Sequence, residues 1–478
     1  MIDKLVLLGA TGDLAGRYLL PALAELHAAG GLPGGFELAG AARDALDDDS
    51  FRQAAGAELA EHAADVPVAA RDALVRSMRY RPVDLEDAES VARAVHGDGN
   101  GGRSDGGGRG GGRRPVAVYL ALPSGLFAPT VRTLGTVGLA PGSRIALEKP
   151  FGEDLESARA LNALLARAGE EAGEHVAFRV DHFLGMASVQ NLLGLRLANR
   201  ALAAAWNSEH IEQVEIVWEE TLALEGRAAY YDRAGQLKDM VQNHLLQVLC
   251  LVAMEPPAAL RARDLRDRKL DVLRAVRPMS PADAVARTRR ARYTAGRIGD
   301  RQVPAYVDED GVDPARATET CAEVALELDN ERWAGTRFVV RTAKAMGRDR
   351  MEVVVRFRPV AGAPFASSPA PAPNELRVGL GELDDHVTLV LTGGAAGTPP
   401  RPAPLALTAP PPPCALPAYS RVLLDILGGE STLSVRGDEA EQAWRIVTPV
   451  LEAWADGSVP LQEYPAGSAG PPPPARRA

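Results

Sequence analysis

Leu5-Val6-Leu7-Leu8-Gly9-Ala10-Thr11-Gly12-Asp13-Leu14-Ala15 joins a short apolar run to a helical stretch, Leu14 to His27, through a turn that contains two glycines. The apolar run is typical of a buried strand. Glycines between a strand and a helix let the backbone turn tightly and approach a pyrophosphate at the helix N-terminus. The pattern predicts a dinucleotide loop with Gly9, Thr11, Gly12, Asp13 and Leu14 as cofactor-binding residues; a purely structural turn is the alternative.

The first 180 residues alternate between strand and helix patterns. Further strand candidates are Phe36–Gly40, Val116–Leu122 and Arg144–Leu147, and apolar residues recur every three and four positions over Leu155–Ala168. Such alternation is typical of a parallel sheet with helices on both faces. We therefore expect an α/β domain over residues 1–180.

Residues 181–478 show a different pattern, in which strand-like runs follow one another without helices between them. A strongly apolar helix is expected over Gln236–Met254. The strand candidates are Ile211–Trp218, Cys321–Leu328, Thr336–Arg341, Met351–Phe357 and Val387–Leu391. This succession predicts an α+β domain with a large, mainly antiparallel sheet.

Four segments have biased composition. Residues 97–115 are rich in glycine and predict a flexible surface loop. Residues 359–373 and 399–413 are rich in proline and alanine and are expected to connect better-patterned segments, and the tail after Tyr464 is expected to be disordered.

Composition excludes several classes of protein. The chain has 478 residues, of which 46% are hydrophobic, and its net charge of −10 disfavours a broad nucleic-acid surface. No apolar run approaches the roughly 18–20 residues that cross a membrane. The three cysteines form no disulfide or zinc pattern. We expect a cytoplasmic protein with no membrane, nucleic-acid or metal partner.

The end of the second strand bears on the choice of cofactor. A carboxylate there binds the ribose of NAD, whereas the additional phosphate of NADP needs a cation. The strand leads into Arg43-Asp44. Arg43 favours NADP because its planar fork suits a phosphate, and Asp44 keeps NAD open.

Six motifs follow one another along the chain. They are the glycine loop, Glu148-Lys149-Pro150-Phe151-Gly152, Arg179-Val180-Asp181-His182-Phe183-Leu184-Gly185, Asp239-Met240-Val241-Gln242-Asn243-His244-Leu245-Leu246-Gln247, Asp329-Asn330-Glu331-Arg332-Trp333 and Ala443-Trp444-Arg445-Ile446-Val447-Thr448-Pro449. Together they resemble the glucose-6-phosphate dehydrogenase family across almost the whole chain. The resemblance implies a Rossmann domain, a β+α substrate-binding and oligomerisation domain, and a homodimer or homotetramer built through the second domain's sheet.

The family oxidises a sugar phosphate at its anomeric carbon to a lactone and passes hydride to a nicotinamide. By resemblance His244 is the catalytic base, Asp181 is its carboxylate partner, and Lys149 lies near both nicotinamide and sugar. Taken without the motif, a histidine on an apolar helix is more commonly a core residue. The other substrate-binding residues carried over by position are His182, Glu220, Asp239, Lys344 and Arg348.

The expected phosphate site departs from the family pattern. Phe183 replaces a tyrosine, Met186 and Tyr18 replace lysines, and Gly381 stands where a glutamine is usual. Three interpretations remain open: oxidation of glucose 6-phosphate in an altered pocket, the same chemistry on another and possibly unphosphorylated sugar, or a nucleotide-binding regulatory paralogue without turnover.

Overall fold

The computed structural model describes residues 1–97, 114–172, 177–226, 228–361, 372–381, 386–395 and 401–472. The chain forms two compact units. The first contains Met1–Gly185, Ala259–Arg266 and Cys414–Glu441; the remaining segments form the second. The first break, after Gly185, lies close to the expected boundary at residue 180, but two segments of the later sequence return to the first unit. The division falls inside helices α12 (Ala262–Ala275) and α15 (Gly437–Ala455).

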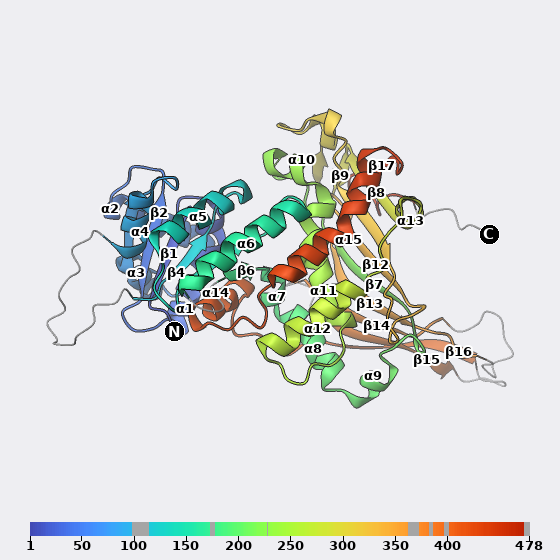
Figure 1. The fold of residues 1–478 in the computed structure, drawn as a ribbon. Coiled ribbons are helices and arrows are strands. Elements are labelled where there is room, and N and C mark those ends of the chain that lie inside the picture. Colours follow the sequence, from blue (N-terminus) through green and yellow to red (C-terminus); the bar gives the residue numbers. More distant parts are fainter. Residues whose placement is uncertain are drawn as a thin grey trace. The chain divides into compact units, whose positions relative to one another are not determined.

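A six-stranded parallel sheet organises the first unit (Figure 1). Its order is β3-β2-β1-β4-β5-β6. The strands are β1 (Lys4–Leu8), β2 (Glu37–Ala42), β3 (Met78–Pro82), β4 (Ala117–Leu120), β5 (Arg144–Glu148) and β6 (Ala177–Val180). This is the strand order of the Rossmann fold, in which the chain moves outward in one direction from β1 and in the other from β4. The expected parallel α/β domain is confirmed.

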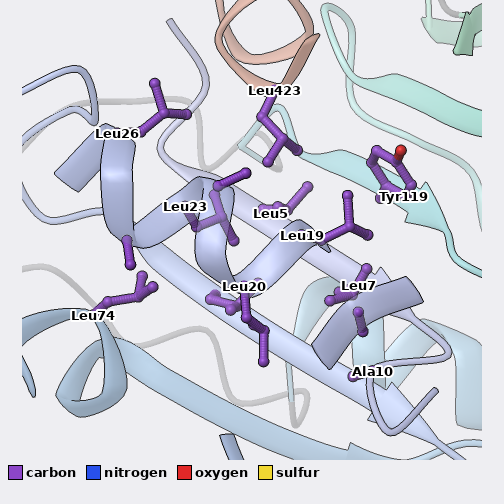
Figure 2. Close-up of a cluster of buried hydrophobic side chains, with 14 of the residues drawn as sticks. Leu5, Leu7, Ala10, Leu19, Leu20, Leu23, Leu26, Leu74, Tyr119 and Leu423 are labelled. Atoms are coloured by element: carbon purple, nitrogen blue, oxygen red, sulfur yellow. The ribbon is translucent and has the colours of Figure 1, made fainter. Parts of the chain in front are cut away.

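Both faces of this sheet are buried. On one face Leu5 and Leu7 pack with Leu19, Leu23 and Leu423 (Figure 2). Side chains of the opposite parity, such as those of Val6 and Leu8, are equally inaccessible. The helical segments are η1 (Ala15–Leu19), α1 (Leu20–Ala28), α2 (Asp48–His62), α3 (Val68–Ser77), α4 (Ala88–His96), η2 (Ser124–Leu126), α5 (Phe127–Val137), α6 (Leu155–Ala172), α7 (His182–Gly185) and α14 (Ala418–Gly428).

A nine-stranded, mainly antiparallel sheet organises the second unit, as expected. Its order is β16-β15-β14-β13-β7-β12-β11-β8-β17, and only the β7–β12 and β8–β17 pairs are parallel. The strands are β7 (Ile211–Glu219), β8 (Thr288–Thr294), β11 (Cys321–Leu326), β12 (Arg337–Ala343), β13 (Arg350–Phe357), β14 (Glu375–Gly379), β15 (Val387–Ala395), β16 (Arg401–Ala409) and β17 (Leu461–Pro465). Strands β9 (Gly296–Ile298) and β10 (Arg301–Val303) form a separate hairpin.

The helices of the second unit include one departure from the expected pattern. The single apolar helix expected over Gln236–Met254 is instead a π-helix, η3 (Leu237–Leu245), followed directly by α11 (Leu246–Ala253). Apolar periodicity alone does not distinguish these two windings. The remaining helical segments are α8 (Ala187–Leu197), α9 (Arg200–Ala205), α10 (Ala228–Gln236), α13 (Pro281–Arg287), η4 (Tyr306–Asp308) and η5 (Pro314–Arg316).

Two of the biased segments are more ordered than their composition predicts. The expected connection 399–413 contains β16, an edge strand that holds Pro402 and Pro404 and pairs with β15 along its length. Proline is tolerated on an edge because one side of the strand needs no donors. In the expected disordered tail, the Gly467 N–H donates to the Ala345 carbonyl at 2.8 Å, so backbone hydrogen bonds continue past Tyr464.

Other parts of these segments lie outside the described residues, namely 98–113, 362–371, 399–400 and 473–478. Within the described ranges, no helix combines the length and the apolar character that a membrane span requires.

Candidate active site

The glycine loop lies at the carboxyl end of β1, next to the reversal of strand order. Gly9 has a φ of +87°, and a Cβ there would lie 2.2 Å from the Ala121 carbonyl oxygen, so only glycine fits. The Gly12 N–H donates to the Gly9 carbonyl at 3.0 Å and closes the turn. Thr11, Gly12 and Asp13 are exposed and Leu14 is half-buried, at the start of the helical segment. The loop is a backbone cradle that a dinucleotide pyrophosphate fits.

Arg43 and Asp44 follow β2 at the same edge of the sheet. The Thr11 hydroxyl donates to Asp44 Oδ2 at 2.7 Å, so the glycine loop already engages that carboxylate. The Tyr80 hydroxyl donates to the Asp44 carbonyl at 2.8 Å, and burial raises the pKa of Tyr80 to about 12. Arg43 is exposed, and no ion pair within the described part of the chain engages it. Its guanidinium can therefore meet a ligand from solvent.

Glu148 is the last residue of β5, two strands away from the glycine loop, and Lys149 follows it. The Tyr119 hydroxyl donates to Glu148 Oε1, and the Tyr419 hydroxyl from α14 also donates to this carboxylate. Burial raises the pKa of Glu148 to about 7, against the lowering effects of the Tyr119 bond and of the Lys149 charge. The peptide bond between Lys149 and Pro150 is cis. Lys149 therefore lies beside a carboxyl group that titrates near neutrality.

Asp181 and His182 follow β6, at the same carboxyl edge. Asp181 is 2% exposed, and its Oδ1 accepts the Phe183 N–H at 2.9 Å. The His182 ring is stacked on Tyr419, with ring centroids 5.2 Å apart and an angle of 13° between the planes. The Rossmann edge thus collects Gly9, Arg43, Lys149, Asp181 and His182 from the ends of four strands.

Two of the four family departures lie in this unit. Phe183 is buried and meets the His182 ring edge-on, with centroids 5.1 Å apart. Tyr18 is 42% exposed, and its ring lies 5.5 Å from that of Tyr419. Both side chains make aromatic contacts at positions where the resemblance led us to expect polar ones. Of the other two positions, Met186 and Gly381 in the second unit, both are buried.

In the second unit, Glu220 and Lys344 form an ion pair at the ends of two neighbouring parallel strands. Lys344 Nζ lies 2.8 Å from Glu220 Oε2, and their side chains are 14% and 17% exposed. The Trp218 indole donates to Glu220 Oε1 at 3.1 Å. Lys344 Nζ also lies 5.6 Å from the Tyr231 ring centroid. This pair offers a cation and a carboxylate side by side, a set suited to hydroxyl or phosphate oxygens.

Asp239 and His244 both lie in the π-helix η3. Asp239 Oδ1 accepts the Tyr230 hydroxyl at 3.2 Å, and His244 is 1% exposed. Their spacing of five residues equals one hydrogen-bonded turn of a π-helix, which is a winding found frequently at functional sites. Arg348, the remaining expected substrate residue, is exposed in the loop before β13.

Sequence reasoning missed three features of these sites. Glu148 was part of a quoted motif but received no role, although its position at a strand end was a usable signal. Tyr419, about 270 residues further along the chain, gave no signal. The π-helical winding was also missed, because the expected helix was inferred from apolar character alone.

Comparisons with known proteins cover almost the whole chain. The model of the glucose-6-phosphate dehydrogenase NAD binding domain matches residues 6–191, and that of the C-terminal domain matches residues 193–476. A glucose-6-phosphate 1-dehydrogenase of Mycolicibacterium smegmatis is 39% identical over 98% of this chain and 94% of its own length. One of Treponema pallidum is 36% identical over 98% of this chain and 92% of its own.

Solved structures agree with these matches. Glucose-6-phosphate 1-dehydrogenase from Mycobacterium avium has a TM-score of 0.83 and 33% identity, covering 98% of this chain and 95% of that one. A glucose-6-phosphate dehydrogenase in complex with glucose 6-phosphate has a TM-score of 0.84 and 29% identity, covering 98% and 96%.

The Rossmann sheet with its glycine cradle, the match to an NAD binding domain and the relatives found place the chain among the oxidoreductases that have a dinucleotide-binding domain. With both family models matched in order along its length, the chain belongs to the glucose-6-phosphate dehydrogenase family.

Proposed function

We propose that the protein oxidises glucose 6-phosphate at C1 to 6-phosphogluconolactone and transfers the hydride to NADP. The observation that carries this proposal is the match over 98% of the chain to curated relatives of that name, at 36–39% identity. Chains related at this level over their full length usually keep their chemistry, and the residue types that the reaction needs are present in both units.

The cofactor assignment rests on the end of β2. The carboxylate of Asp44 accepts a hydrogen bond from Thr11, whereas the Arg43 guanidinium is exposed to solvent. A cation that is not already paired favours the additional phosphate of NADP. NAD remains the alternative cofactor, because Asp44 lies beside Arg43 and its carboxylate can bind a ribose hydroxyl in place of the Thr11 hydroxyl.

In the proposed mechanism His244 is the base. Oxidation of an alcohol requires removal of its hydroxyl proton, which an imidazole nitrogen of His244 accepts. Asp181 is the carboxylate assigned to stabilise the imidazolium that forms. Lys149 favours negative charge on the sugar oxygen. Glu220 and Asp239 accept hydrogen bonds from sugar hydroxyls. The glycine loop and Arg43 would hold the dinucleotide, whose nicotinamide would supply the acceptor for the hydride that leaves C1.

The phosphate group is assigned to His182, Lys344 and Arg348. Phe183 and Met186 have no hydroxyl or ammonium group, so they cannot make the phosphate contacts that the resemblance implies for a tyrosine and a lysine. Phe183 makes an aromatic contact instead, and Met186 is buried. A charge-assisted hydrogen bond contributes about 1.5–3 kcal/mol. We therefore expect weaker binding of the phosphate than in relatives that keep the tyrosine and lysine, and this favours a second candidate function, the same oxidation on another sugar.

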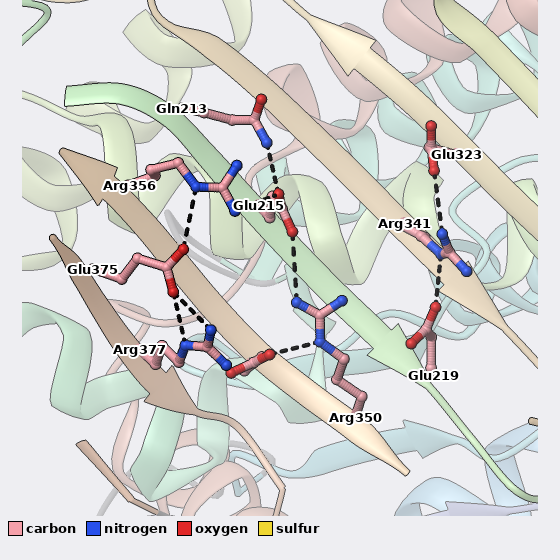
Figure 3. Close-up of polar contacts among 10 residues, drawn as sticks. Gln213, Glu215, Glu219, Glu323, Arg341, Arg350, Arg356, Glu375 and Arg377 are labelled. Atoms are coloured by element: carbon pink, nitrogen blue, oxygen red, sulfur yellow. Dashed lines mark hydrogen bonds and ion pairs between the residues drawn. The ribbon is translucent and has the colours of Figure 1, made fainter. Parts of the chain in front are cut away.

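We also propose that the protein is a homodimer or homotetramer assembled through one face of the nine-stranded sheet. This face carries an ion-pair network in which each charged residue has a partner on its own or a neighbouring strand (Figure 3). Glu375 in β14 accepts from Arg356 at 3.2 Å and from Arg377 at 2.7 Å, and Arg350 lies 2.6 Å from Glu352. Charges that are already paired with one another can be covered by a second copy without being stranded.

The oligomer is tested by sedimentation velocity. Glu375→Lys places a third cation beside Arg356 and Arg377 and should weaken self-association. The exposed charge reversal Glu61→Lys in α2 serves as the control and should leave it unchanged. A monomeric wild-type protein, or equal behaviour of both variants, would contradict the proposed interface.

One assay tests the reaction. The purified protein is incubated with NADP or NAD and with glucose 6-phosphate, glucose or related sugars, and nicotinamide reduction is followed at 340 nm, the wavelength at which reduced nicotinamide absorbs. The proposal expects the highest kcat/KM with glucose 6-phosphate and NADP. A higher value with another sugar would establish the second candidate. Cofactor binding without turnover on any sugar would indicate a regulatory paralogue.

A further inference from the structure

The π-helix η3 places two proposed site residues in a defined relation to each other. Asp239 and His244 are five residues apart, which is the spacing of one hydrogen-bonded π-helical turn, so their side chains project from similar sides of the helix. In an α-helix the same spacing would rotate one side chain by about 140° from the other. Their relative orientation therefore depends on how this segment is wound.

The first residue of the π-helix is held by a buried carboxylate from outside the helix. The Leu237 N–H donates to Glu319 Oε1 at 2.9 Å, and the Gln236 N–H donates to the Glu319 carbonyl at 3.2 Å. Glu319 lies just before β11 and is 8% exposed. Burial raises the pKa of Glu319 to about 6, so it is an anion at neutral pH. An anion at a helix N-terminus makes a strong hydrogen bond and complements the exposed N–H groups.

The turn that leads into the π-helix is shaped to admit this carboxylate. Gly235 has a φ of +69°, and a Cβ there would lie 2.6 Å from Glu319 Oε1. The next side chain, Gln236, is fully buried and donates to the Thr342 hydroxyl at 2.5 Å. The Tyr231 hydroxyl donates to Gln236 Oε1. Glu319, Thr342 and Tyr231 thus hold Gln236 and Leu237 in place, where the π-helix begins.

We propose that Glu319 is a positioning residue for the reaction: by binding the Leu237 N–H it fixes where the π-helix begins and thereby orients Asp239 and His244. This inference rests on the proposed function of those two residues. Without an acceptor at Leu237, the segment is free to rewind toward the commoner α-helical register, which would turn His244 away from Asp239.

Three substitutions separate geometry from charge. Glu319→Gln keeps an acceptor oxygen at the same reach and removes the charge, and should retain kcat within about threefold. Glu319→Asp keeps the charge but withdraws the oxygen by one methylene, and Glu319→Ala removes it. Both should lower kcat by about 10²-fold, the typical effect of a displacement of about 1 Å in a site. KM for NADP should be unchanged, because the glycine loop and Arg43 belong to the other unit.

The control is Thr318→Val in the same loop. The Thr318 hydroxyl donates to the Asp232 carbonyl at 2.8 Å, so this variant loses a buried hydrogen bond that does not involve the π-helix. It should lower the melting temperature while retaining kcat. A loss of kcat in Thr318→Val equal to that in Glu319→Asp would show that both act through stability and would overturn the proposal.

Two further outcomes would overturn it: full kcat in Glu319→Asp, or equal defects in Glu319→Gln and Glu319→Asp. The Gln and Asp comparison decides the matter even if Glu319→Ala does not fold. His244→Asn distinguishes this inference from the function on which it rests. If His244→Asn retains turnover, the base assignment fails; if only His244→Asn is inactive, the Glu319 inference alone fails.

Discussion

The two sheets of this protein hold the residues that we propose to be functional in different ways. In the six-stranded sheet, Gly9, Arg43, Lys149 and Asp181 each follow the carboxyl end of a parallel strand, so one edge collects them. In the second unit, Glu220 and Lys344 follow neighbouring strands, but Asp239 and His244 depend on an unusual helix. Topology alone therefore positions the residues proposed for the cofactor, whereas those proposed for the sugar need additional contacts to hold them in place.

The largest expected effect tests whether His244, in the π-helix, is the catalytic base. His244→Asn should lower kcat by about 10²–10⁴-fold, because a general base typically contributes that much. The dissociation constant for NADP, measured by fluorescence titration, should change less than twofold, because the glycine loop lies in the other unit. A variant with more than half of the wild-type turnover would show that another group removes the proton.

A smaller effect is expected from the ion pair at the strand ends. Lys344→Met removes a cation that we assign to the sugar phosphate and leaves Glu220, which is 17% exposed, without its partner. KM for glucose 6-phosphate should rise by about 10–100-fold, the equivalent of one charge-assisted hydrogen bond. Arg348→Met, at an exposed position, should raise it less. The reverse order would place the phosphate at Arg348 instead.

On the cofactor side, Arg43→Ala should weaken NADP by about tenfold and leave NAD almost unchanged, because only NADP has a phosphate for the guanidinium to bind. We place the effect at the low end for a charge-assisted bond because Arg43 is exposed to solvent and to salt. The two dissociation constants provide the measurement. Equal losses for both cofactors would assign Arg43 to the structure of the loop rather than to recognition.

The smallest effect concerns Glu148 and the dependence of stability on pH. Its pKa is about 7 in the folded protein, against an ordinary value of 4.5, so folding takes up a proton between these pH values. Its contribution to stability is therefore lost as pH rises from about 4.5 to 7. The side chain of Glu148→Gln stays neutral at every pH. The melting temperature of this variant, relative to that of wild type, should therefore rise between pH 5 and pH 8.

The matched control for this measurement is Glu156→Gln, at an exposed position in α6. The difference between its melting temperature and that of wild type should stay constant over the same range. A difference for Glu148→Gln that is also constant would mean that the Glu148 carboxyl does not titrate there.

The sequence predicted most of the parallel edge, because residues that follow consecutive parallel strands are brought together by topology. The glycine loop, Arg43 and the strands that precede them, β1 and β2, were found from local patterns. Strands β3 and β6 were not predicted, and Lys149 and Asp181 were assigned by the family resemblance. Tyr419 was not found, since it reaches Glu148 from a helix more than 250 residues away in the chain and nothing near it signals this contact.

The second unit was harder to predict for a physical reason. A run of apolar residues indicates burial, but it does not specify whether a helix closes its turns over four residues or five. The residues at the start of η3 instead contact Glu319 and Thr342, which lie in separate parts of the chain. The family resemblance supplied the roles of Asp239 and His244 without supplying this support.

The two prolines of β16 bear on how readily the protein aggregates at high concentration. Pro402 and Pro404 are two residues apart, so their missing N–H groups fall on one side of the strand, and pairing with β15 continues past both. The outer edge of the sheet therefore lacks two of the donors that an incoming strand from another molecule would need. Unprotected edge strands can pair with strands of other molecules and cause aggregation. These prolines oppose such pairing at the β16 edge.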